Sequence, residues 1–276
     1  MWNEYLEKAN LYKGLADYYK YRNSKLYHEY KRKYYEYTKK FVAAYEKEKG
    51  VKPPKPPFPP YPSSYFFLNR AQVSHEPVNI RLLHASVNEQ KTPVDVYIDG
   101  QLLARSLPYG VATRYLRLPA GEKRFDLYPA GRKGTRPLLR QTAVLEREKN
   151  YLIALVDSEV AYPWNLRLLP YPEYPAQMSG EAGVRFIHLA EGGPVLDLSL
   201  RDGTVLFPDV TYQEVMEYFA LPPVRTRLLI RQAKTDGVLA TTPDVHFRPG
   251  KAYTIIAICP NRQMSALVLR DQSLRR

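Results

Sequence analysis

The sequence predicts a mainly β protein, in which two tandem antiparallel β-sandwiches follow a long N-terminal α-helix or a helical hairpin. Three observations lead to this prediction. A stretch of about a hundred residues occurs twice. Short apolar runs in each copy alternate with turn-forming residues. Aromatic residues near the N-terminus recur at helical spacing.

The repeat is clearest where each copy begins, at Val78 and at Gly183. Each copy opens with an arginine, a histidine and an aspartate in the same order: Arg81, His84 and Asp95, then Arg185, His188 and Asp197. Matched tyrosines continue the similarity through Tyr151 and Tyr253. Because a unit of this length can enclose its own core, the repeat indicates two domains rather than the short modules of a solenoid.

Within each copy, the strands are predicted from short runs such as NIRLLH, VDVYI and NYLIALV. Turn signals separate them, including Asp99-Gly100 and the PAG triplet that starts at Pro119. Such a series with no helical period predicts an antiparallel sandwich. We expect a first sandwich at residues 78–170, a hinge at 171–182 and a second sandwich at 183–276.

Residues 1–49 show a different pattern, an amphipathic stripe with Lys, Arg and Glu on the other side. The stripe predicts either one continuous helix or a hairpin bent near Asn23. This stripe is expected to pack either against the protein's own domains or against another helix, in a coiled coil that mediates assembly. The expected assembly seam consists of Tyr5, Tyr12, Tyr19, Asn23, Leu26, Tyr30, Tyr34, Tyr37 and Phe41.

Residues 50–77 are predicted to be a proline-rich linker and a lead-in to the first sandwich. The run from Pro53 to Pro62, PPKPPFPPYP, favours an extended polyproline II spacer. A docking site for a domain that binds PxxP peptides is the alternative.

Composition limits the range of partners and locations. The 276 residues carry a formal charge of +13, which favours anionic partners. The single cysteine, Cys259, excludes an intrachain disulfide, and its apolar surroundings predict a buried, inert thiol. The N-terminus has no apolar signal segment, and no run reaches the ~20 apolar residues of a spanning helix, so we expect cytoplasmic synthesis without a signal peptide.

The repeated polar residues are the candidates for chemistry. We expect His84 with Asp95, and His188 with Asp197, to be structural pairs in which each histidine bonds either the aspartate or a backbone group. Each copy offers at most two ligands, which is too few for a metal site. Arg81 and Arg185 either pair with these aspartates or face solvent. No catalytic, metal-binding or cofactor-binding residue is predicted, because no motif with the required spacing occurs.

The opening pattern of each copy, followed in the first by PVDVYIDG, a Pro-Tyr-Gly turn and YLRLPAG, resembles the family known as domain of unknown function number 4397. The resemblance covers Val78 to about Arg270. It implies tandem immunoglobulin-like or transthyretin-like sandwiches of bacterial envelope and secreted proteins, and no catalytic role. The second copy departs from the pattern at Ser199, where the first has Tyr97.

Together these features predict a non-enzymatic structural or assembly protein, with no cofactor. We expect it to form a homo-oligomer, or to bind other structural proteins, through residues 1–49. A bacterial envelope or spore-coat layer is the expected setting. The alternative is a binding module whose sandwich loops or basic arm contact an anionic glycan, protein or nucleic acid. Nucleic acid fits less well, since the tyrosines follow a helical stripe and not a flat stacking platform.

Overall fold

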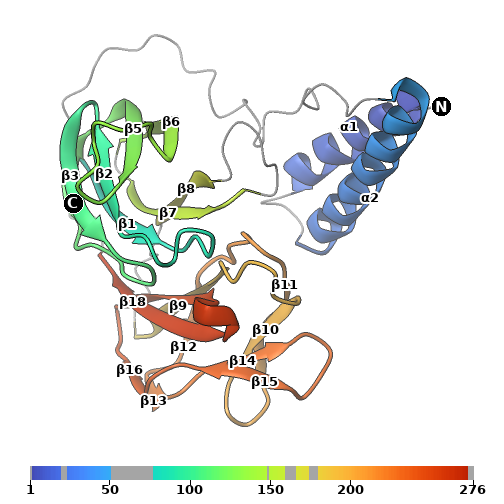
Figure 1. Ribbon diagram of the computed structural model, residues 1–276. Coiled ribbons are helices and arrows are strands. Elements are labelled where there is room, and N and C mark those ends of the chain that lie inside the picture. The colour runs from blue at the N-terminus through green and yellow to red at the C-terminus, as the bar shows by residue number, and fades with distance from the viewer. Residues whose placement is uncertain are drawn as a thin grey trace. The chain divides into compact units, whose positions relative to one another are not determined.

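The computed structural model (Figure 1) contains a helical unit within residues 1–71 and a β unit within residues 72–276, and each is described by itself. The described residues are 2–19, 24–50, 77–147, 149–158, 166–173 and 180–272.

The helical unit is a hairpin of α1 (Trp2–Tyr19) and α2 (Ser24–Lys49), so the hairpin alternative holds. Aromatic side chains join the two helices along their length. The Trp2 ring lies 5.1 Å from that of Tyr45, and Tyr12 stacks on Tyr37 at 5.4 Å between ring centroids. Much of the aromatic stripe is therefore covered by the other helix of the same chain.

Some of the expected features lie outside the described residues. These are Asn23, the side chains of Tyr19 and Leu26, and the proline run from Pro53 to Pro62. None of the helices in the described part of the chain is long and apolar enough to span a membrane.

The first sandwich contains two sheets, with strand orders β4-β1-β7-β8 and β3-β2-β5-β6. Its strands are β1 (Pro77–His84), β2 (Val94–Ile98), β3 (Gln101–Leu107), β4 (Leu116–Pro119), β5 (Gly121–Pro129), β6 (Leu139–Leu145), β7 (Asn150–Asp157) and β8 (Leu166–Glu173). All pairs are antiparallel except β1 with β7, which is parallel. Asp99 and Gly100 both have positive φ, 50° and 84°, as a tight β2–β3 hairpin turn requires.

The second sandwich repeats this strand order, as the duplicated sequence predicts: β12-β9-β17-β18 and β11-β10-β14-β15. A further pair, β13 with β16, forms a separate two-stranded sheet, where the first copy has one long β5–β6 hairpin. The strands are β9 (Ala182–His188), β10 (Leu196–Ser199), β11 (Val205–Val210), β12 (Phe219–Leu221), β13 (Val224–Thr226), β14 (Leu229–Gln232), β15 (Val238–Thr241), β16 (Val245–Phe247), β17 (Ala252–Ile258) and β18 (Ser265–Asp271).

Strand β8 extends beyond the sequence-based boundary. It runs to Glu173, through Pro170 and Pro172, whereas the hinge was expected to start at residue 171. Proline is tolerated here because β8 is an edge strand, which among the described strands pairs with β7 alone. This extension places Glu173 opposite Asn150 of β7.

Each sandwich has its own apolar core, and the two central strands of one sheet are buried on both faces. In β1, Ile80 and Leu82 point into the core of the first sandwich, while Arg81 and Leu83 lie on the other face. All four side chains are buried. A strand buried on both faces has no side open to water, so a polar residue on it, such as Arg81, requires buried hydrogen-bond partners.

Candidate functional site at the contact between the sandwiches

A third apolar cluster joins the two sandwiches. It combines residues of β1, β7 and β8 with residues from β9 and β17, all on the strand faces that point away from the two sandwich cores. Equivalent positions of the two copies meet here. Its buried members are Leu83, Ala85, Leu152, Ala154, Val156, Leu169, Tyr171, Ile187, Leu189, Ile256 and Ile258.

Beside this cluster, two arginines and two carboxylates form a buried ion network. Arg81 donates two hydrogen bonds to Glu173, at 2.6 and 3.0 Å, and another to Asp271 of the other sandwich. Arg185 bonds Glu173 across the same contact at 3.3 Å, and Thr254 at 2.8 Å. These four charged residues are at most 6% exposed, and their formal charges cancel.

Two tyrosines complete the network, each bonding the carboxylate of its own sandwich. Tyr115 donates its hydroxyl proton to Glu173, and Tyr218 donates to Asp271 at 2.6 Å. Each arginine also lies over the tyrosine ring of its own sandwich, at 5.0 Å from the ring centroid in both copies. Each sandwich thus supplies one arginine, one carboxylate and one tyrosine to a shared site.

The electrostatics of this network follow from its burial. Burial raises the pKa of the Glu173 carboxyl, against the opposite effect of the Arg81 guanidinium. Burial lowers the pKa of Arg81, but the carboxylates of Glu173 and Asp271 outweigh it and leave that pKa raised. Burial raises the pKa of Tyr115 and of Tyr218, so both hydroxyls remain proton donors. The network is balanced in charge, and its four charged side chains are buried, whereas the two tyrosines are partly exposed.

At the other end of the contact, another pair of tyrosines forms reciprocal hydrogen bonds between the two sandwiches. The backbone amide of Cys259 donates to the Tyr109 hydroxyl at 3.1 Å, and the equivalent Tyr212 hydroxyl donates to the backbone carbonyl of Asp157 at 3.3 Å. Cys259 itself is half-buried, not buried as its apolar run suggested. Burial and the Glu191 carboxylate nevertheless raise the pKa of its thiol.

The two histidines are fully buried and hydrogen-bond to the backbone. The Nε2 atom of His84 lies 3.3 Å from the carbonyl oxygen of Thr92, and that of His188 lies 2.9 Å from the carbonyl oxygen of Pro194. Of the two expected arrangements, the structure has the histidine–backbone contact. Each histidine anchors the loop that leads into the second strand of its sandwich, and burial lowers the pKa of both rings.

The two aspartates do not pair with these histidines among the described residues, because their carboxylates bond a β-bulge instead. Asp95 accepts from the backbone amide of Ser106, and Asp197 accepts from that of Asp209, both at 2.7 Å. Ser106 and Asp209 have positive φ values of 49° and 54°, and strand pairing shifts register at this point in both copies. The carboxylates therefore stabilise the strained backbone of an equivalent bulge.

Neither Arg81 nor Arg185 reaches these aspartates, and their true partners were missed at the sequence level. Glu173 and Asp271 occupy matching places at the ends of the last strands, β8 and β18. Each sandwich therefore ends its last strand with an acidic residue, a repeated signal that was available in the sequence.

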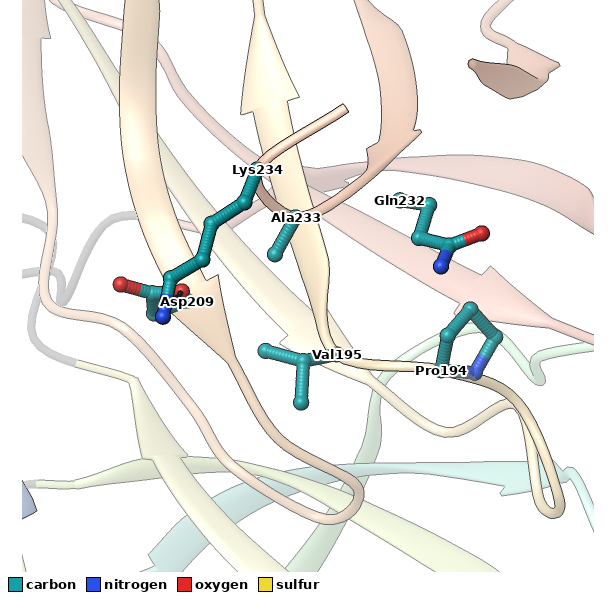
Figure 2. Close-up of a pocket in the computed structure, with 6 residues that line it drawn as sticks. All are labelled: Pro194, Val195, Asp209, Gln232, Ala233 and Lys234. Atoms are coloured by element: carbon teal, nitrogen blue, oxygen red, sulfur yellow. Dashed lines mark ion pairs between the residues drawn. The ribbon is translucent and has the colours of Figure 1, made fainter. Parts of the chain in front are cut away.

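Two shallow hollows occur at equivalent places on the sandwiches. The second-sandwich hollow, of about 280 Å³, is lined by six residues from the loop before β10, the β11 bulge and the turn after β14 (Figure 2). The first-sandwich hollow is about 360 Å³. Hydrogen bonds establish the equivalence, since Ala130 donates to the carbonyl of Pro93 as Ala233 does to that of Val195, each at 2.8–2.9 Å.

Several solved structures are similar to this chain at low sequence identity. A candidate cell adhesion protein from Bacteroides ovatus is 11% identical, with a TM-score of 0.23, and the match covers 72% of this chain and 97% of that one. A family 26 carbohydrate-binding module from Eubacterium rectale, in complex with maltoheptaose, is 10% identical, also with a TM-score of 0.23, over 71% and 97%. No curated protein matches the sequence.

One family model does match the chain, over residues 78–199 and again over residues 194–276. The matched residues contain both opening motifs and the arginines, tyrosines and carboxylates that join the two sandwiches. The chain therefore belongs to the family described as Domain of unknown function (DUF4397).

Proposed function

We propose that this protein is a non-enzymatic structural component that self-associates through its helical hairpin, residues 2–49, while its two sandwiches act as one rigid body. A layer at the bacterial envelope or in a spore coat is the setting we propose for it. The polar residues that the two copies share support a non-catalytic role. They are engaged in the ion network, the histidine–backbone contacts and the bulges, and the four charged side chains of the network are buried.

The observation that carries the self-association proposal is the small core of the hairpin. Among the hairpin side chains that are described, those of Ala9, Ala16 and Phe41 are buried, whereas Leu11 is 57% exposed. Five tyrosines of the expected seam are only half-buried: Tyr5, Tyr12, Tyr30, Tyr34 and Tyr37. Two helices bury too little surface for independent stability, and pairing two hairpins into a four-helix bundle is a common solution.

The proposal is tested by measuring the mass of the full chain by light scattering over a range of concentrations. We expect a dimer of 32.0 kDa chains, and a monomer when residues 1–71 are removed. Leu11→Lys should weaken the dimer without affecting the fold, because this side chain is exposed within its own hairpin. Leu102→Lys, at an exposed position of β3, is the matched control and should leave the mass unchanged.

Salt separates self-association from the binding of an anionic partner. Residues 1–49 contain 12 Lys and Arg against 7 Asp and Glu, so two hairpins repel each other electrostatically. Added salt screens this repulsion and should strengthen the dimer, whereas it would weaken a complex with a polyanion. A full chain that stays monomeric at high concentration and high salt, or Leu11→Lys behaving like Leu102→Lys, would refute the proposal.

A further inference from the structure

The two hollows occupy the same place in the two copies but differ in charge. Each is lined by the loop before the second strand and by the turn that follows β5 or β14. In the second hollow, Lys234 has a carboxylate partner, Asp209, at 3.8 Å, and Figure 2 shows the two side chains together on one side of the hollow. Its charged groups therefore cancel.

The first hollow lacks this neutralising carboxylate. The residue at the position of Asp209 is Ser106, because both stand at the bulge and donate their backbone amides to the equivalent aspartates. Lys91 and Arg132 both line the first hollow, and both are exposed. Neither forms a salt bridge within the described residues. With the carboxylate of Glu89 included, the hollow has two cations and one anion.

We infer that the first hollow binds an oxyanion, as the carboxylate, sulfate or phosphate group of a small ligand, through Lys91 and Arg132. A guanidinium and an ammonium are the side chains that bind such groups. Two prolines and an alanine, Pro93, Pro129 and Ala130, form an apolar wall against which the uncharged part of the ligand packs. A volume of about 360 Å³ is at the lower limit of small-molecule sites, so one small unit is accommodated.

This inference goes beyond the proposed assembly function. The oxyanion site depends on the first sandwich and the self-association depends on the hairpin, so one proposal can fail while the other holds. The second sandwich supplies an internal comparison, since its hollow has the same backbone frame without the free positive charge.

The experiment is an amide NMR titration of the full chain at constant ionic strength, with sodium glucuronate, inorganic phosphate and neutral glucose as separate probes. We expect saturable shifts at Lys91, Ala130 and Arg132 with one or both anions and not with glucose. Shifts with both anions identify a general oxyanion site, and shifts with glucuronate alone identify a carboxylate on a sugar. The amides of Ala233 and Lys234 should move little.

Charge variants give the decisive comparison. Lys91→Gln and Arg132→Gln should each weaken binding by about three- to five-fold, as for an exposed ion pair. Glu89→Gln should tighten it, and Lys234→Gln should have no effect. Asp209→Ser should release Lys234 and produce new shifts at the second hollow, since serine already occupies the equivalent bulge position in the first copy.

All five substituted side chains are at least partly exposed, so folding is not at risk. The inference is overturned if neither anion binds, if glucose binds equally well, or if Lys91→Gln and Arg132→Gln act no differently from Lys234→Gln. Equal shifts at both hollows in the unmodified protein would also overturn it.

Discussion

Replacing Arg81 with methionine is the most direct way to test the ion network. Methionine keeps much of the apolar volume of the arginine stem but removes the guanidinium. Glu173 would lose two hydrogen bonds, at 2.6 and 3.0 Å, and Asp271 would lose its partner from the other sandwich. Glu173 would keep its 3.3 Å contact with the remaining arginine, Arg185, and Asp271 would be left with its bonds to the Tyr218 and Thr254 hydroxyls.

The expected loss is large because the carboxylates are buried. Removing one partner of a buried ion pair typically costs about 3–5 kcal/mol, since the other charge stays desolvated and uncompensated. An exposed pair is worth less than about 1 kcal/mol. Arg225→Met tests this contrast with the same substitution at a pair whose side chains are 73% and 39% exposed, the 2.8 Å contact of Arg225 with Asp244.

The assay is urea unfolding followed by circular dichroism, at fixed pH and salt. The original protein should unfold its two sandwiches in one transition, because they share a buried apolar cluster. Arg81→Met should lower the unfolding free energy by about 3–5 kcal/mol or split the transition in two. If Arg81→Met costs no more than Arg225→Met, the network does not hold the sandwiches together and our interpretation of this contact is wrong.

Three further outcomes follow from the contacts of single residues. Burial lowers the pKa of His84 and of His188, so the stability that each contributes is present above the unfolded value of about 6.5 and is lost as the pH falls. The free energy of unfolding should therefore be lower at pH 5.5 than at pH 7.5, by up to about 1.4 kcal/mol per pH unit for each histidine, and His188→Gln should reduce this slope. Asp95→Ala leaves two backbone amides without their acceptor and should cost about 1–3 kcal/mol in urea unfolding, more than Asp197→Ala, for which one such bond occurs. The raised thiol pKa of Cys259 should make its alkylation at pH 8 slower than that of free cysteine, and an equal rate would contradict the assigned environment.

The fold was predictable because it depends on signals that are local or repeated. Turn residues such as Asp99-Gly100 and apolar runs such as NYLIALV define strands, and the duplication transfers each assignment to the other copy. The boundary predicted for strand β8 lies too early in the chain, because prolines such as Pro170 and Pro172 usually mark the end of a strand. Only the sheet order shows that β8 lies at an edge, where proline is tolerated.

The partners of the repeated polar residues were harder to predict, since they depend on contacts between distant segments. Arg81 and Asp271 are separated by 190 residues, and no sequence period places them together. The interpretation of His84 with Asp95 as a possible pair failed for a related reason. Sequence proximity suggested contact, but the bulge at Ser106 offers the carboxylate a backbone donor at 2.7 Å.

Because the contacts between the two sandwiches are reciprocal, a further sandwich cannot be added to the chain through the same surface. Arg81 reaches a carboxylate of the second sandwich, and Arg185 reaches one of the first, as in the isologous interface of a symmetric dimer. Such an interface is saturated by two members, so a third sandwich cannot join it. The two sandwiches are therefore like the subunits of a dimer joined by a peptide. The peptide gives each sandwich an effective concentration in the millimolar range at the surface of the other. The contact between the sandwiches is therefore independent of how much protein is present.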